Sequence, residues 1–170
     1  MDLHRATVFQ MGKALSNLLL WLDKAADHAR AKGFDGDSLL SSRLAPDQFT
    51  LVRQVQAACD TAKFAAARLA GREAPSHEDA ETTLDELRAR IRATTAFLET
   101  FDPAAFEGAE ERTVPLPFVP DRAARGEDYL IEFAQPNFYF HLTTAYAILR
   151  HNGVELGKRD YIGSIRLLPA

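Results

Sequence analysis

The most conspicuous polar pair in the sequence is Asn137 and His141, four residues apart within the strongly apolar stretch 126–152. Side chains at positions i and i+4 lie on the same face of a helix. Ala145 and Ile148 continue that face, so the imidazole is expected either to point into a helical bundle or to lie against a partner helix. It could be a core histidine with a hydrogen-bonded neighbour, a metal ligand or a general base.

A second polar group lies in the stretch 46–70, where Gln56, Asp60 and Lys63 share one helix face. In one interpretation this face is a solvated stripe with a weak ion pair between Asp60 and Lys63. In the other it points inward, and Gln56 and Asp60 meet His141 across the bundle. Asp60 would then orient the imidazole or supply an oxygen ligand. The pattern leaves both open, and it makes His141 and Asp60 the candidate catalytic residues.

Aromatic side chains are denser in the stretch 126–152 than elsewhere in the chain. Most are expected to pack in the core or in a dimer interface. The remainder could line an apolar pocket with a few polar groups, which is the usual composition of a small-molecule site. We take Asn137, Gln56 and Tyr146 as candidates for binding a cofactor or ligand. The aromatic residues are Tyr129, Phe133, Phe138, Tyr139, Phe140 and Tyr146.

Four stretches with helical periodicity would position these side chains. Apolar residues recur at alternate spacings of three and four, which is typical of bundle helices and would scatter over both faces of a strand. The sequence therefore predicts an all-α protein, an antiparallel four-helix bundle in a single domain spanning 1–170. The predicted helices cover residues 3–31, 46–70, 76–101 and 126–152.

Proline and capping residues set the predicted helix boundaries. Pro46 is expected in the first turn of the second helix, and Ser76 is expected to cap the third. Pro136 lies inside the fourth and predicts a kink or a break there. Residues 103–125 are interpreted as a long crossover across one end of the bundle, with an extended or hairpin-like stretch from Thr113 to Val119.

Composition excludes several classes of function. The chain has 20 Lys and Arg against 24 Asp and Glu, a net charge of −4, and its basic residues are scattered among acidic ones. Nucleic-acid binding is therefore not expected. The N-terminal residues do not resemble a secretion signal, and no apolar run approaches the roughly 18 residues of a membrane span, so we expect a cytoplasmic protein without membrane contact. Cys59 is the only cysteine and is expected to be a small buried apolar residue.

Three stretches spread over the chain carry a likeness to a known family. They read RQVQAACDTAKFAAARLAG, FDPAAFEGAEERTVPLPF and QPNFYFHLTTAYAILRHNGVELGKRDYIG. Together they resemble a bacterial domain-of-unknown-function branch of the DinB-like, or YfiT-like, superfamily of metalloenzymes. The resemblance implies a four-helix bundle with a long crossover between helices three and four, usually in a homodimer. It also implies a divalent metal such as nickel or zinc and thiol-dependent transferase or isomerase chemistry.

The same resemblance implies a site of three histidines, one on the second helix and an H-x-x-x-H pair on the last. His141 takes the second position of the pair, and Asn137 stands at the first. The second helix has no histidine, and Gln56 or Asp60 occupies that region. Amide carbonyls with one histidine make a weak zinc or nickel site. The metal site is therefore expected to be degenerate, without a tightly bound cofactor, although Asp60 and His141 could hold a metal weakly or act as a metal-free acid–base pair.

Three functional hypotheses follow. The first is a bundle with a degenerate metal site that binds a small molecule or is non-catalytic. The second is a transferase or hydrolase, with or without a metal, that uses His141. The third is a stress-related interaction protein in which the dimer surface matters more than any pocket.

Overall fold

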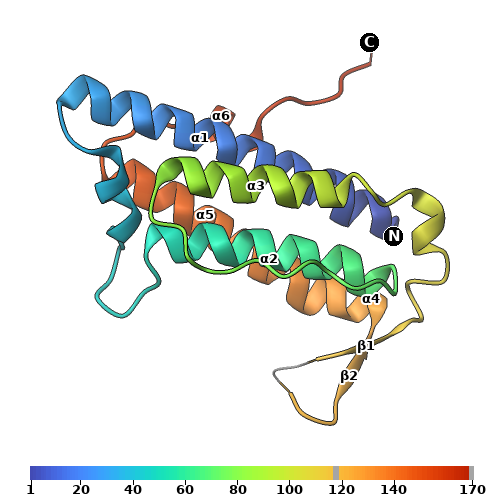
Figure 1. Cartoon of the computed structure of the whole chain (residues 1–170). Coiled ribbons are helices and arrows are strands. Elements are labelled where there is room, and N and C mark those ends of the chain that lie inside the picture. The colour runs from blue at the N-terminus through green and yellow to red at the C-terminus, as the bar shows by residue number, and fades with distance from the viewer. Residues whose placement is uncertain (117–118, 169–170) are drawn as a thin grey trace.

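Four long helices pack side by side and form the body of the protein (Figure 1). The fold is taken from a computed structural model, which describes residues 1–116 and 119–168. The long helices are α1 (Gln10–Lys32), α2 (Leu51–Leu69), α3 (Leu84–Leu98) and α5 (Gln135–His151). The shorter elements are η1 (Arg5–Phe9), η2 (Gly36–Ser41), η3 (Pro103–Phe106), β1 (Thr113–Pro115), β2 (Ala123–Arg125), α4 (Gly126–Asp128), η4 (Tyr129–Ala134) and α6 (Lys158–Ile162).

The expected four-helix bundle is confirmed, and its neighbouring helices run in two senses. α1 with α3 and α2 with α5 are antiparallel pairs, whereas α1 with α5 and α2 with α3 run in the same direction (Figure 1). The parallel arrangement of α2 and α3 follows from the segment 70–83, which returns along α2 before the next helix begins. The bundle therefore has two long connections, this segment and the 99–125 connection that crosses one end.

The third helix begins later than the sequence predicted, so the expected cap at Ser76 is wrong. Thr83 is the N-cap of α3, and with Glu86 it forms a reciprocal capping box. Residues 72–83 remain non-helical because their acidic side chains are held by cations of neighbouring helices. Asp79 and Glu81 form ion pairs with Arg90 of α3, and such contacts hold the segment extended against the bundle.

The second helix also begins later than predicted, at Leu51, and Pro46 lies in a turn before it. The backbone N–H of Leu51 donates to the carbonyl of Ser42 over 2.9 Å. This bond closes the loop that contains Pro46, and Thr50 is extended at the N-cap. The first helical residue is therefore set by loop closure rather than by proline.

The fourth predicted helix is continuous from Gly126 to His151, so of the kink or break expected at Pro136, the break is wrong. Pro136 lies at the junction where the π-helix η4 gives way to α5, and there a missing backbone N–H costs little. The first residue of this helix, Gly126, has to be glycine, because a Cβ there would lie 1.9 Å from the carbonyl oxygen of Ala109. Only glycine allows this close approach.

The 99–125 connection leads from α3 to the diagonally opposite helix, across one end of the bundle (Figure 1). It contains a short antiparallel hairpin, with Thr113 paired to Arg125 and Pro115 to Ala123. The hairpin-like stretch that the sequence indicated is therefore present. Residues 117–118 of that stretch lie outside the described residues.

Buried apolar side chains from all four long helices form one core cluster. Trp21, Phe138 and Leu87 are among its largest fully buried members, with exposed fractions of 1% or less. Burial of such side chains is the main stabilising contribution to a helical bundle. No helix in the described part of the chain is long and apolar enough to span a membrane.

Candidate functional site

Side-chain hydrogen bonds join α2 to the antiparallel helix formed by η4 and α5. Their partners on α2 are seven residues apart, so they lie along one line of the helix surface. All of them lie between two helices, where a polar side chain needs a partner. The bonds join His141 to Gln54 (2.7 Å), Asn137 to Thr61 (2.7 Å) and Tyr129 to Arg68 (3.1 Å).

His141 is held in one orientation by its neighbours. Its Nδ1 lies 2.7 Å from Oε1 of Gln54, and the Nε2 of Gln54 donates to the carbonyl of Phe49. Because the amide oxygen can only accept, Nδ1 carries the proton and Nε2 carries the lone pair. The Phe49 ring stacks on the imidazole at 6.2 Å, and burial lowers the pKa of His141. The ring is therefore neutral near pH 7, with its lone pair on Nε2.

A cleft of about 250 Å³ runs beside these bonds, between α2 and η4–α5. Aromatic rings form much of its wall, and amide, hydroxyl and guanidinium groups point into it. This composition is typical of a small-molecule site, and the volume is slightly below the roughly 300–1,000 Å³ of drug-sized pockets. The lining residues are Arg53, Gln56, Ala57, Asp60, Thr61, Phe64, Arg68, Asp79, Tyr129, Phe133 and Asn137.

The π-helix η4 shapes one wall of this cleft. Tyr129 and Phe133 lie in η4, and Asn137 follows in the first turn of α5. A π segment adds a residue relative to regular α-helix, so the eight-residue step from Tyr129 to Asn137 matches the seven-residue step on α2. π segments occur often at functional sites. Here it brings three side chains from one helix to the same cleft.

Gln56 and Asp60 point toward α3 and the segment 70–83 rather than toward His141. The carboxylate of Asp60 lies 2.9 Å from Arg90 and 2.9 Å from Lys63. The amide of Gln56 donates to Glu81 over 2.7 Å. The predicted Asp60–Lys63 ion pair is therefore present, but the Lys63 side chain is only 1% exposed and does not belong to a solvated stripe.

Arg90 is the centre of this ionic cluster. Its side chain is 2% exposed and contacts the carboxylates of Asp60, Asp79 and Glu81 at 2.9 to 3.0 Å. Burial raises the pKa of Glu81, but hydrogen bonds from Arg90 and Gln56 outweigh that effect and hold it below its ordinary value. The carboxylate of Asp60 is therefore occupied by structural ion pairs with Arg90 and Lys63. Asp60 lines the cleft only with the part of its side chain that these contacts leave uncovered.

Comparison with known proteins assigns the chain to a family. Residues 3–162 match the family described as a domain of unknown function, DUF1993. The chain belongs to this family. It is also similar to a crystal structure of a DinB family member from Shewanella denitrificans, with 50% identity, a TM-score of 0.95, and coverage of 99% of this chain and 96% of that one. No curated protein matches the sequence. The DinB resemblance seen in the sequence is confirmed.

The residues of this DUF1993 chain do not fit the zinc or nickel site that the DinB resemblance implies. Among the described residues, no three His, Cys, Asp or Glu side chains are grouped so as to hold a metal ion. Asn137 uses an amide N–H on Thr61, and Gln54 is the α2 residue that contacts His141. One imidazole with neutral amides is a poor donor set for these metals.

Two other residues considered from the sequence lie away from the cleft of the DUF1993 bundle. Tyr146 packs against Trp21 and Tyr161 at ring distances of 5.5 and 5.6 Å, on the side of α5 that faces α1 and α6. Cys59 is fully buried, and burial raises its pKa to about 12. It is therefore a packed, unreactive thiol, as the sequence indicated.

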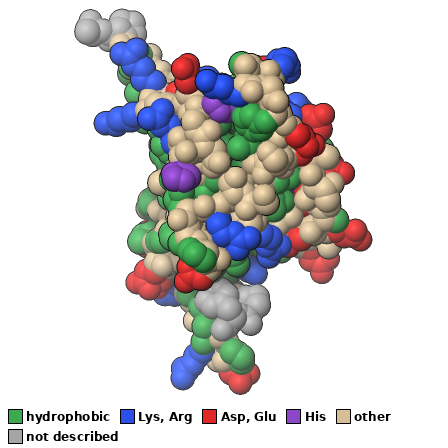
Figure 2. Space-filling model, turned by 90° about the vertical axis from the view of Figure 1, so that its left-hand side faces the viewer, with side chains coloured by type: hydrophobic (Ala, Val, Ile, Leu, Met, Phe, Trp, Pro, Cys, Tyr) green, Lys and Arg blue, Asp and Glu red, His purple; other side chains and the backbone are tan. Residues whose placement is uncertain are grey.

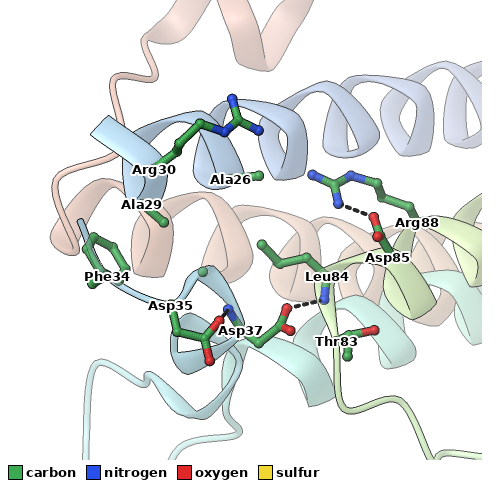
Figure 3. Close-up of a pocket in the computed structure, with 11 residues that line it drawn as sticks. Ala26, Ala29, Arg30, Phe34, Asp35, Asp37, Thr83, Leu84, Asp85 and Arg88 are labelled. Atoms are coloured by element: carbon green, nitrogen blue, oxygen red, sulfur yellow. Dashed lines mark hydrogen bonds and ion pairs between the residues drawn. The ribbon is translucent and has the colours of Figure 1, made fainter. Parts of the chain in front are cut away.

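A second, larger cleft of about 470 Å³ lies between the end of α1, the turn at Asp35–Asp37 and the start of α3 (Figure 3). Its polar groups already have partners within the chain. Asp37 accepts from the backbone N–H of Leu84 over 2.7 Å, and Arg88 pairs with Asp85 over 2.6 Å (Figure 3). The cleft is therefore a capped helix junction, and we do not regard it as a binding site.

The end of the DUF1993 bundle shown in Figure 2 carries Lys and Arg side chains in several separate groups, with Asp and Glu side chains near them. No single basic stripe covers this face.

Gln54, Thr61 and Arg68 were not among the site residues predicted from the sequence, although their seven-residue spacing is visible there. They were overlooked because they flank the apolar seam of α2 instead of interrupting it.

Proposed function

We propose that this DUF1993 protein is a DinB-like bundle with a degenerate metal site, and that it binds a small organic molecule in the cleft between α2 and η4–α5. The observation that carries this proposal is the convergence of Asn137, Tyr129 and Arg68 with aromatic rings in one cleft. Pockets of this composition are the usual place for a ligand.

The polar groups of the cleft support a binding role because they retain hydrogen-bonding capacity. Asn137 donates one amide N–H to Thr61, and its side chain forms no other hydrogen bond with the described residues. Its carbonyl oxygen and second N–H are therefore available to a ligand. In contrast, Gln56 uses both ends of its amide, on Arg53 and on Glu81. Asn137 is thus the amide best suited to orient a bound molecule.

A fragment screen by thermal shift, followed by a cleft-blocking variant, tests the proposal. Ala57 lines the cleft and is partly exposed, so Ala57→Phe should fill it while leaving the core intact. Fragments that stabilise the wild-type protein should lose this effect in Ala57→Phe. The matched control is Ala93→Phe on the exposed face of α3, which should retain the hits. The proposal fails if no fragment stabilises the wild-type protein, or if the same fragments stabilise Ala57→Phe equally well.

A second candidate function is transferase or hydrolase activity with His141 as a metal-free general base. The hydrogen bond to Gln54 favours it, because it leaves the lone pair of the imidazole on Nε2. Thiol transfer to an activated chloroarene such as 1-chloro-2,4-dinitrobenzene gives a direct assay. The wild-type rate should exceed that of His141→Gln by about 100-fold or more if His141 is the base. Equal rates in the two proteins would remove this candidate.

The expected homodimer remains a proposal. Ile165, Leu167 and Leu168, in the C-terminal residues after α6, are 65%, 81% and 84% exposed. Exposed apolar groups of this kind are often covered in an assembly. Sedimentation equilibrium of the full chain should give twice the monomer mass, and a monomer mass across the accessible concentration range would contradict the proposal.

A further inference from the structure

Arg68 is a half-buried cation that lines the cleft and has no acidic partner among the described residues. Its guanidinium lies over the rings of Phe64 and Tyr129, with centroid distances of 5.0 and 5.8 Å, and donates to the hydroxyl of Tyr129. Within the described chain no carboxylate lies within ion-pair distance of it. The other cations near the cleft, Arg53 and Lys63, each have an acidic partner at 2.9 Å or less.

The groups around Arg68 form a set of donors. The Tyr129 hydroxyl accepts from Arg68, so its own proton remains available to an acceptor. Burial raises the pKa of Tyr129, and the phenol therefore stays protonated at neutral pH. The remaining N–H groups of a guanidinium form a planar fork that matches a carboxylate. Arg68 and Tyr129 together thus complement a group that only accepts hydrogen bonds and carries negative charge.

Acidic side chains in the cleft limit how much negative charge a ligand can bring. Asp60 and Asp79 line the cleft, and each is paired with Arg90; Asp60 lies about two helical turns from Arg68 along α2. A phosphate monoester carries about −1.5 to −2 charges near pH 7 and would face these carboxylates with only one free cation in the described cleft. A carboxylate brings a single charge. Between Asp60 and Arg68 on α2 lies Phe64, which with Phe133 of η4 offers an apolar wall.

We propose that the ligand of this cleft is a small monocarboxylate with an apolar or aromatic body, whose acid group binds Arg68 and Tyr129. The body lies along Phe64 and Phe133, and Asn137 binds a polar substituent at its other end. The inference rests on the proposed binding function and adds the chemical class of the ligand. Arg68 is accordingly the residue that selects acids over neutral analogues.

Benzoate and benzamide are matched probes for this proposal, because they share size and shape and differ in charge. Two-dimensional amide NMR titrations of the full chain should show both probes shifting the signals of Thr61, Arg68 and Asn137. The dissociation constant of benzoate should be at least tenfold lower, a difference of about 1.4 kcal/mol. In Arg68→Met the two constants should become equal. Arg92→Met, on the exposed face of α3, should preserve the preference.

The possible outcomes separate the two proposals. Equal affinities of benzoate and benzamide at the cleft would overturn the carboxylate inference and leave the binding function intact. Shifts at the cleft from neither probe would contradict the carboxylate inference, while fragment hits lost in Ala57→Phe would still support binding. A preference that persists in Arg68→Met would also overturn the inference. If Arg68→Met fails to fold, Tyr129→Phe keeps the ring and removes the hydroxyl, and it should weaken benzoate binding more than benzamide binding.

Discussion

The imidazole of His141 donates its Nδ1 proton to Oε1 of Gln54 across 2.7 Å, and this bond joins the last long helix to α2 near one end of the bundle. Gln54 is 0% exposed and its amide also donates to the carbonyl of Phe49. Both polar ends of a fully buried amide are therefore satisfied, as buried amides require. The bond orients the imidazole and places the proton of its neutral form on Nδ1.

This environment predicts a pH dependence of stability. Burial lowers the pKa of His141 below the value near 6.5 of an unperturbed imidazole. The unfolded chain then binds more protons, so the contribution is complete above about pH 6.5 and is lost as pH falls through that value toward the folded pKa. The free energy of unfolding in urea should decrease between pH 8 and pH 5.5, and this slope should be smaller in His141→Phe.

The slope, not the absolute stability, is the informative quantity in that experiment, because His141→Phe also removes a partner of Gln54. His77 should keep part of the slope in the variant, since burial and the nearby charges of Lys63 and Arg90 lower its pKa too. His151→Phe replaces an exposed ring and is the control. An unchanged slope in His141→Phe would contradict the assigned neutral state.

The ionic cluster predicts a large effect of Arg90→Met. The variant leaves three carboxylates of the cluster without their shared cation, and removing one partner of a buried ion pair typically costs about 3–5 kcal/mol. We expect about 3 kcal/mol, because Asp60 and Asp79 are 30% and 39% exposed and are partly solvated. Urea denaturation followed by circular dichroism measures it. Arg92→Met, two residues along the same helix, should change stability by less than about 0.5 kcal/mol.

The thiol of Cys59 should be unreactive in the folded protein. It is 0% exposed, and burial raises its pKa to about 12, so the thiolate that reacts with disulfide reagents is scarce. With Ellman's reagent at pH 8, reaction should require opening of the bundle, and it should be complete within the mixing time in denaturant. Rapid labelling of the native protein would show that α2 and α3 separate easily near this residue.

Metal analysis tests the degenerate site directly. Protein purified without a histidine tag should contain well below one nickel or zinc ion per chain, and added metal should bind weakly, because a single imidazole and neutral amides are its donors. Elemental analysis and isothermal titration give the two quantities. About one ion per chain that is lost in His141→Ala would mean that the donor set is completed in a way that these contacts do not reveal.

Sequence pattern predicted the helices well where a long apolar face had to be buried. The first helix extends to Lys32, close to the predicted 31, because its spacing of three and four fits only one periodicity. The predicted starts of the third and second helices, at Ser76 and Pro46, were wrong, although good local signals exist at both residues. At both places a contact beyond the local helical turn decided the outcome. Leu51 bonds to Ser42, and Asp79 and Glu81 pair with Arg90; local propensity is weak against such contacts.

The site residues divide in the same way, into features that a local pattern indicates and features that contacts between helices decide. His141 and Asn137 were singled out from their position on an apolar face. The interpretation in which Gln56 and Asp60 turn inward and meet His141 is wrong, since Gln54 contacts His141 and Thr61 contacts Asn137. At about 100° per residue, Gln54 and Gln56 lie about 200° apart around α2, so the side chain that meets His141 and the one that meets Glu81 are on different faces of that helix.

The sequence by itself determined the helical class through the periodicity of its apolar residues, and the family through the likeness of three stretches of the chain. It also indicated the burial of Cys59 through its Ala-rich surroundings. Only the tertiary structure decided which faces meet. It directed Asp60 to Arg90, left Arg68 without an acid within the described chain, and opened a cleft beside Asn137. The physical reason is that ion pairs and helix packing act over a few ångströms between residues far apart in the chain, and a one-dimensional pattern does not contain those distances.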